Sequence, residues 1–146
     1  MVSVDRLKFL SPNLARQLNS APIEKRRAAG IIACEFAAKA AAIHDPLAIE
    51  TLRRLQAGQP LTAQQRADLE SKAAATDSRY LDEQAAVDQG NASDCSRAFA
   101  VARAWAALSC ASSDSVSATS EAIYEAAAAM GDERAHLFAA IESSLA

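Results

Sequence analysis

Apolar residues cover nearly the whole circumference of one predicted helix, which lies between residues 94 and 111. At about 100° per residue, one of its sides holds Trp105 and Leu108, and alanines occupy most of the opposite side. Only Arg97 and Arg103 interrupt this apolar surface. A helix that is apolar nearly all round is buried by neighbours on several sides. We therefore expect helix 94–111, which carries the only Trp of the chain, to lie at the centre of the fold.

The periodicity of apolar positions, together with capping residues, predicts helices along the rest of the chain. Asp45 precedes a proline and is a good N-cap, and Thr62 with Gln65 forms a capping-box pattern. Most of the glycines stand where helices are expected to end, whereas Gly30 lies inside a helix and indicates a close crossing with another. The predicted helices cover residues 4–9, 12–19, 22–43, 46–57, 63–89, 94–111, 116–130 and 133–144.

The composition favours helices and disfavours a β-sheet. The 146 residues include 37 Ala but only 16 β-branched residues, and Ala has the highest helix propensity. A chain of this length is sufficient for one domain with a substantial core. The sequence predicts an all-α fold, a single domain over residues 1–146, with about six to eight antiparallel helices packed around helix 94–111.

The cysteines and the absence of a long apolar run bear on the compartment. Cys95 and Cys110 would lie about 22 Å apart on one helix, which is too far for a disulfide. With Cys34 they make an odd number without C-x-x-C spacing, which is typical of reduced thiols. The sequence also lacks an apolar leader and an uncharged apolar run of about 18 residues. We expect a cytoplasmic protein without a membrane span.

Charge is distributed unevenly along the chain. Residues 1–54 carry nine Lys and Arg against five Asp and Glu, and residues 55–146 carry six against thirteen. The net charge of −3 argues against a general nucleic-acid-binding protein.

The most acidic stretch runs from residue 77 to residue 94, where Arg79 is the only basic residue. One interpretation is a solvated helix face on which Glu83 pairs with Arg97 or Arg103. The other is a docking surface for a basic protein, because acidic residues around an apolar or aromatic residue favour electrostatic steering. The predicted partner-binding face consists of Asp77, Tyr80, Leu81, Asp82, Gln84, Asp88 and Asp94.

Two short patterns resemble metal sites but are incomplete. Glu133 and His136 have the E-x-x-H spacing of di-iron helical bundles, which need a second such motif and two further Glu. His44 and Asp45 resemble the metal-binding pair of helical phosphohydrolases, but no His precedes them, and Asp45 is explained as a helix cap. His44 at the end of the preceding helix suits the helix dipole.

Candidate nucleophiles and phosphate-binding residues also have plain structural interpretations. Ser109 and Cys110 have no His nearby in sequence, and the chain contains no nucleophile-elbow motif or Gly-rich phosphate loop. Lys25, Arg26 and Arg27 are compatible with a phosphate site, but consecutive residues point in different directions on a helix, which favours a solvated helix start. We assign no catalytic residue, metal ligand or cofactor to the chain.

Three segments carry a resemblance to other proteins, and all lie within residues 47–134. They read LRRLQAGQPLTAQQRADLE, SRYLDEQAAVDQGNASDCSRAFAVARAWAAL and SEAIYEAAAAMGDE. Here the chain resembles small all-helical bacterial proteins, some of which are similar to immunity proteins that protect a cell from its own secreted toxin. The resemblance implies a cytoplasmic, non-enzymatic antidote that covers a toxin's surface. It carries over no functional residue.

We therefore expect a protein-binding protein, an immunity protein that neutralises a cognate toxin with a basic domain. Neither nucleic acid nor a membrane is expected as a partner. One alternative is a metal-dependent helical-bundle enzyme that uses Glu133, His136, Glu121 or Glu125. Another is a homodimeric scaffold or regulatory protein, since Ala-rich helices with Gly30 can pack against a second copy.

Overall fold

The computed structural model describes residues 5–90, 95–113 and 117–146, and within these ranges it contains helices and no strand. The all-α fold class is therefore confirmed. The elements in chain order are α1 (Leu7–Leu10), α2 (Pro12–Ser20), α3 (Ile23–Ala40), α4 (Pro46–Gln56), α5 (Ala63–Asp88), α6 (Ser96–Ala111), α7 (Ala118–Met130), a 3-10 turn (Gly131–Glu133) and α8 (Arg134–Leu145).

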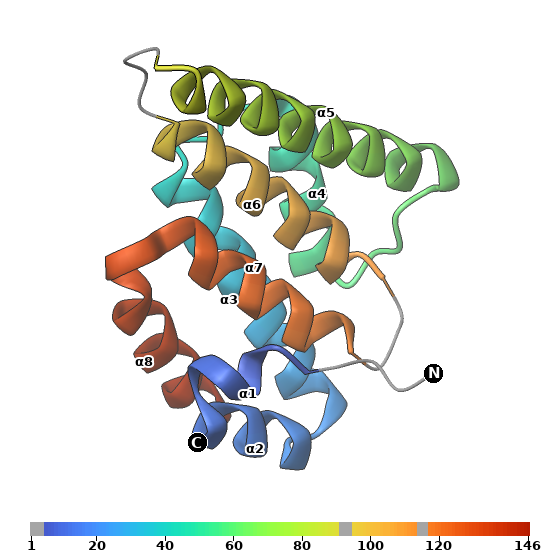
Figure 1. The fold of residues 1–146 in the computed structure, drawn as a ribbon. Coiled ribbons are helices and arrows are strands. Elements are labelled where there is room, and N and C mark those ends of the chain that lie inside the picture. The colour runs from blue at the N-terminus through green and yellow to red at the C-terminus, as the bar shows by residue number, and fades with distance from the viewer. Residues whose placement is uncertain (1–4, 91–94, 114–116) are drawn as a thin grey trace.

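Helix α6 lies between α5 on one side and α3 and α7 on the other (Figure 1). Helix α3 crosses behind α6 and α7 and also packs on α8, so it joins both halves of the molecule. The α1–α2 pair closes the far end, where α1 contacts α7 and α2 contacts α8. The predicted central helix is thus confirmed, although it begins at Ser96 and the predicted residue 94 lies outside the described ranges.

Trp105 of α6 is the largest side chain of the core and only 1% exposed. Around it the helices present small side chains to one another. On α6 these include Ala104 and Ala107, and both α3 and α7 are lined by buried alanines. Small side chains shorten the distance between packed helices, because interaxial spacing depends on the residues at the contact.

The predicted N-caps are present in the structure. The Asp45 carboxylate accepts a hydrogen bond of 2.9 Å from the backbone N–H of Leu47. The Thr62 hydroxyl accepts from the N–H of Gln65 at 3.1 Å, and the Gln65 side chain accepts from the N–H of Thr62 at 2.9 Å. This reciprocal capping box fixes where α5 begins.

Helix α3 ends earlier than the sequence predicts, at Ala40 rather than residue 43. Ala42 adopts a left-handed conformation with φ of 53°. The N–H of Ile43 then donates to the carbonyl of Ala38 at 2.9 Å, which completes a glycine-type helix cap without a glycine. No residue in the sequence marks this end, because Ala rarely adopts a positive φ.

Gly30 lies where α3 crosses α7, as the sequence predicts. It is buried, and a Cβ atom built on it would lie 3.6 Å from Cγ2 of Thr119. That distance is ordinary van der Waals contact, so the crossing leaves room for one methyl group.

We predict that Gly30→Ala stabilises the protein by about 0.4–1 kcal/mol, because Ala restricts the unfolded chain and is accommodated in the helix. Urea unfolding followed by circular dichroism measures the change. A loss of stability would mean that α3 and α7 approach more closely than the structure shows.

Trp105→Ala should cost about 3–5 kcal/mol in the same assay, because it empties the centre of the core. Leu81→Ala is the matched control. Leu81 is 63% exposed, and its truncation should change stability by no more than about 0.5 kcal/mol. Equal effects of the two substitutions would contradict the placement of α6 at the centre.

Candidate functional site

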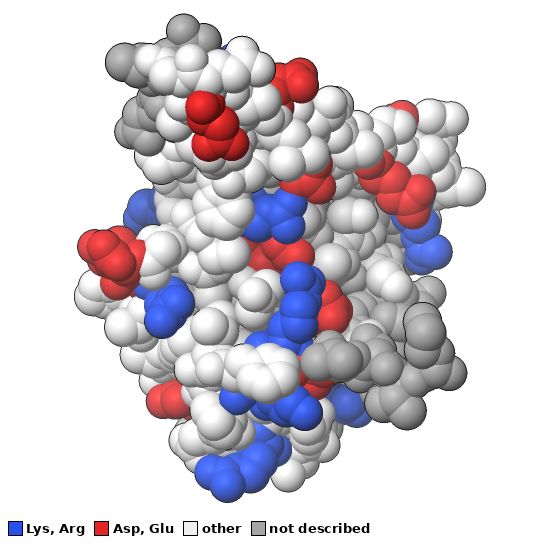
Figure 2. All heavy atoms as spheres, viewed as in Figure 1, with Lys and Arg blue, Asp and Glu red and all other residues white. Residues whose placement is uncertain are grey.

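The net charge of the whole chain equals the charge of α5. This helix contains six acidic and three basic residues, and the rest of the chain contains twelve of each. Leu69 is its only buried residue, so α5 packs on α6 along one side and presents the other side to solvent. In Figure 2 acidic side chains mark this upper edge of the molecule.

The predicted partner-binding residues do not all lie on one face. At about 100° per residue, Asp77, Gln84 and Asp88 fall on one stripe of α5, whereas Asp82 is turned by about 140° from Asp77. Asp77, Tyr80 and Gln84 are half-buried, and Leu81, Asp82 and Asp88 are exposed. Asp94 lies outside the described residues.

Three of these residues hold α5 against α6. Asp77 forms an ion pair with Arg103 of α6. The Tyr80 ring packs at a tilt on Phe99 of α6, with 5.2 Å between centroids, and its hydroxyl donates to Gln84 Oε1 at 3.2 Å. Their polar groups are engaged within the fold and are not available as a free binding surface.

We give the name outer face to four of the exposed residues of α5, three of which lie within about 40° of Asp77 around the helix and one, Asp82, about 140° from it. Its three carboxylates form no ion pair with a described cation, although Asp88 accepts a hydrogen bond of 3.2 Å from Gln84 Nε2. The outer face consists of Glu70, Leu81, Asp82 and Asp88.

The expected pairing of Glu83 with Arg97 or Arg103 is wrong. Glu83 instead lies 3.5 Å from Arg79 Nε, one turn earlier on α5. Arg103 is already occupied, because it donates to Glu125 Oε2 at 2.7 Å as well as to Asp77. An ion pair between residues i and i+4 of one helix restricts the side chains less than an ion pair that reaches from α5 to α6.

A chain of ion pairs, which sequence reasoning missed, runs from α5 to the start of α1. Glu125 of α7 is only 5% exposed and accepts from Arg103 and, at 2.9 Å, from Arg6. Arg6 also donates to Glu121 at 2.6 Å and lies over the Tyr124 ring at 4.2 Å. Figure 2 shows blue and red patches that alternate down the centre of the visible face.

Both arginines of this set of ion pairs, Arg6 and Arg103, stay charged. Burial lowers the pKa of Arg103, but Glu125 and Asp77 outweigh it and hold the pKa above its ordinary value. Glu121 and Glu125 do the same for the pKa of Arg6. The arrangement neutralises a buried carboxylate and ties four segments of the chain together, which is a structural role.

The candidate metal ligands are not brought together. Glu133 and His136 lie on the surface and contact each other, with 3.2 Å between Nε2 and Oε2. Glu121 and Glu125 are held by arginines instead. No group of three His, Cys, Asp or Glu in the described part of the chain could hold a metal ion. His44 is exposed.

The thiols of Cys110 and Cys34 are poorly suited to nucleophilic chemistry. Burial, with smaller contributions from the negative charges of Glu125 and Glu121, raises the pKa of Cys110 to about 11. Burial also raises the pKa of Cys34, whose thiol donates to the carbonyl of Ala107 at 3.4 Å. The thiolate, which is the reactive form, is disfavoured at both positions.

Comparison of the chain with protein-family models, with curated proteins and with solved structures gives no match. Among the described residues, no helix combines the length and apolarity that crossing a membrane requires.

We predict that Glu125→Ala destabilises the protein by about 2–4 kcal/mol, because it leaves Arg6 and Arg103 without their buried partner. Glu121→Ala removes one more exposed contact and should cost less than about 1 kcal/mol. Chemical unfolding of both variants tests the difference. Equal costs would show that Glu125 does not hold the helices together.

Proposed function

We propose that this chain is a non-enzymatic protein-binding protein, and that it acts in the cytoplasm as an immunity protein that neutralises a toxin with a basic domain. The observation that carries the proposal is that the net charge of the chain resides in α5, a helix whose solvent side packs against no described element. The three free cysteines agree with a reducing compartment.

Charge and apolar contact are combined on the outer face. Leu81 is 63% exposed and neighbours Asp82, and Asp88 lies two turns further along α5. Carboxylates without ion-pair partners attract a basic protein over distance, which raises the association rate. A central apolar side chain then supplies contact energy once water is excluded.

The inner side of α5 makes this surface rigid before a partner arrives. Asp77, Tyr80 and Gln84 fix the helix through contacts with Arg103, Phe99 and Cys95, respectively. A preformed helix loses little conformational entropy on binding, so more of the contact energy appears as affinity.

The alternative functions have less support. A metal-dependent enzyme would need Glu133 and His136 to converge with Glu121 or Glu125, but the latter two are engaged by Arg6 and Arg103. A homodimer formed through two outer faces would place like charges opposite each other, which disfavours association.

The test uses the toxin encoded beside the gene for this chain, because an immunity gene normally adjoins its toxin gene. We expect Asp82→Lys with Asp88→Lys to lower the association rate by about tenfold or more, with a smaller change in dissociation. Surface plasmon resonance at about 50 mM salt measures both rates where screening is weak. Co-expression should show that the variant protects cells less well.

The matched control is Asp132→Lys with Glu142→Lys, which changes the net charge equally at exposed positions away from α5. Its association rate should stay within about twofold of the wild type, since the charges removed do not face the partner. Equal slowing by both variants would show that overall charge, and not the outer face, drives binding. Failure of the wild-type chain to retain the toxin would overturn the proposed function.

A further inference from the structure

A cavity of about 370 Å³ has no residue of the outer face in its described lining. It is bounded by the first half of α3, the connection between α4 and α5, and the end of α6. Its volume falls within the range of small-molecule sites.

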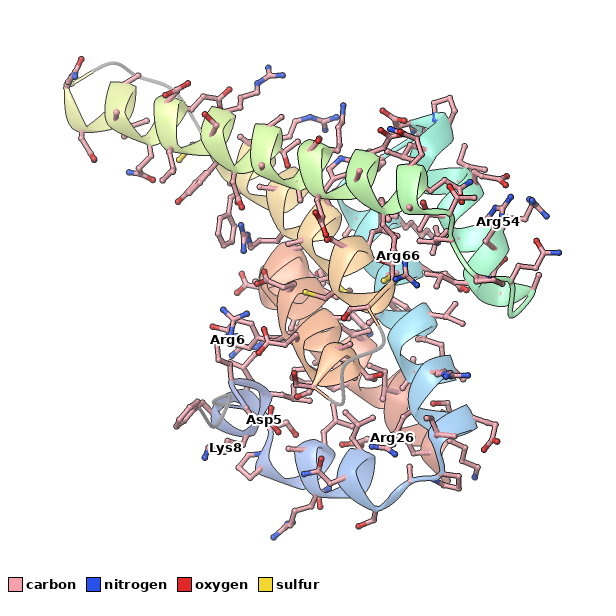
Figure 3. The ribbon with its side chains drawn as sticks, turned by 90° about the vertical axis from the view of Figure 1, so that its right-hand side faces the viewer. Asp5, Arg6, Lys8, Arg26, Arg54 and Arg66 are labelled. Atoms are coloured by element: carbon pink, nitrogen blue, oxygen red, sulfur yellow. The ribbon has the colours of Figure 1, made fainter. Side chains whose placement is uncertain are left out.

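The described lining is strongly basic. It contains Arg26 and Arg27 from α3 and Arg66 from α5, and no Asp or Glu. In Figure 3 Arg66 lies at the upper end of this region and Arg26 at the lower end, whereas Arg54 points outward to the side. Arg54 is engaged elsewhere, since it donates to Glu50 at 3.1 Å and to the carbonyl of Pro60 at 3.0 Å.

Arg26 is the residue with unused binding capacity. Its Nε atom is buried from solvent and has no hydrogen-bond partner. No described carboxylate forms an ion pair with Arg26, so its positive charge is not neutralised within the described part of the chain. The planar guanidinium suits carboxylate and phosphate groups, which accept two parallel hydrogen bonds from it.

The middle of the cavity is apolar. Ile31, Leu55 and Leu61 contribute aliphatic side chains, and Gly30 contributes no side chain, which leaves space beside Thr119. A ligand that fills this space must therefore carry both an anionic group and an apolar body.

We propose that this cavity binds a small amphipathic organic anion, with its carboxylate or phosphate group at Arg26 and its apolar part along Ile31, Leu55 and Leu61. The site lies apart from the outer face of α5, so the proposal does not depend on the proposed function. Bound ligand would join α3, the α4–α5 connection and the end of α6, and would stabilise the folded chain by an amount that grows with the logarithm of ligand concentration once this exceeds the Kd.

The test uses isothermal titration calorimetry with four probes. Octanoate and octyl phosphate carry both parts of the proposed ligand, acetate carries only the anionic group, and octanol only the apolar body. We expect octanoate or octyl phosphate to bind at least about tenfold more tightly than acetate or octanol, because only they satisfy both halves of the cavity. The tighter of the two identifies the preferred anionic group.

Arg26→Gln should weaken binding of the preferred probe by about tenfold or more and leave octanol unchanged, because only the charged contact is lost. Arg97→Gln, at an exposed position on α6, is the charge-matched control and should bind like the wild type. Backbone amide shifts of the wild-type protein provide a second readout, and the probe should move the signals of Gly30 and Thr119.

Three results would overturn the proposal. The first is equal affinity for octanoate, octyl phosphate and octanol, which would indicate apolar adsorption only. The second is an equal loss of affinity in the Arg26 and Arg97 variants. The third is a set of amide shifts that lies outside the cavity, a result that remains decisive if the Arg26 variant does not fold.

Discussion

The close approach of alanine-lined helices around Trp105 is the constraint on which the rest of the structure depends. Helices α3, α6 and α7 meet through buried alanines, and Gly30 marks the point where α3 and α7 cross. With few large side chains to interlock, the core gains its contacts from proximity, and a well-packed interior responds to even one added or lost methylene. Helix α5 contributes only Leu69 to the fully buried core, so it depends on α6 for its position.

Charged residues fall into three groups, namely those that hold helices together, those that face solvent, and the arginines that line the cavity. Glu125, Arg103 and Arg6 join α7, α6 and the start of α1, and Asp77 extends this set to α5. The carboxylates of the outer face have no such partner among the residues that the structure describes, which is why charge reversal there can separate binding from folding. The arginine-lined cavity is a third case, in which cationic groups converge on a space without a described carboxylate. Each group of charges therefore has a different physical consequence.

The sequence predicted the helices well, because N-capping residues such as Asp45 and the Thr62–Gln65 pair mark where they begin. It missed the end of α3, where Ala42 takes a conformation that its side chain does not favour. It identified the acidic helix but grouped Asp77 with the exposed residues, because only the packing of α5 on α6 brings Asp77 to Arg103. It noted Arg26 and Arg27, but nothing local indicates that Leu55, Leu61 and Arg66 lie beside them.

We expect stability to reside in the α3–α6–α7 core, and the last part of α5, from Leu81 to Asp88, to contribute little to it. Native-state hydrogen exchange in low denaturant tests this most directly, because it reports the opening free energy of each amide. We predict that amides around Trp105 and Ile123 exchange only through global unfolding, while those from Leu81 to Asp88 exchange through smaller local openings. Exchange of all α5 amides only through global unfolding would contradict this expectation, since residues Leu81 to Asp88 would then unfold together with the core.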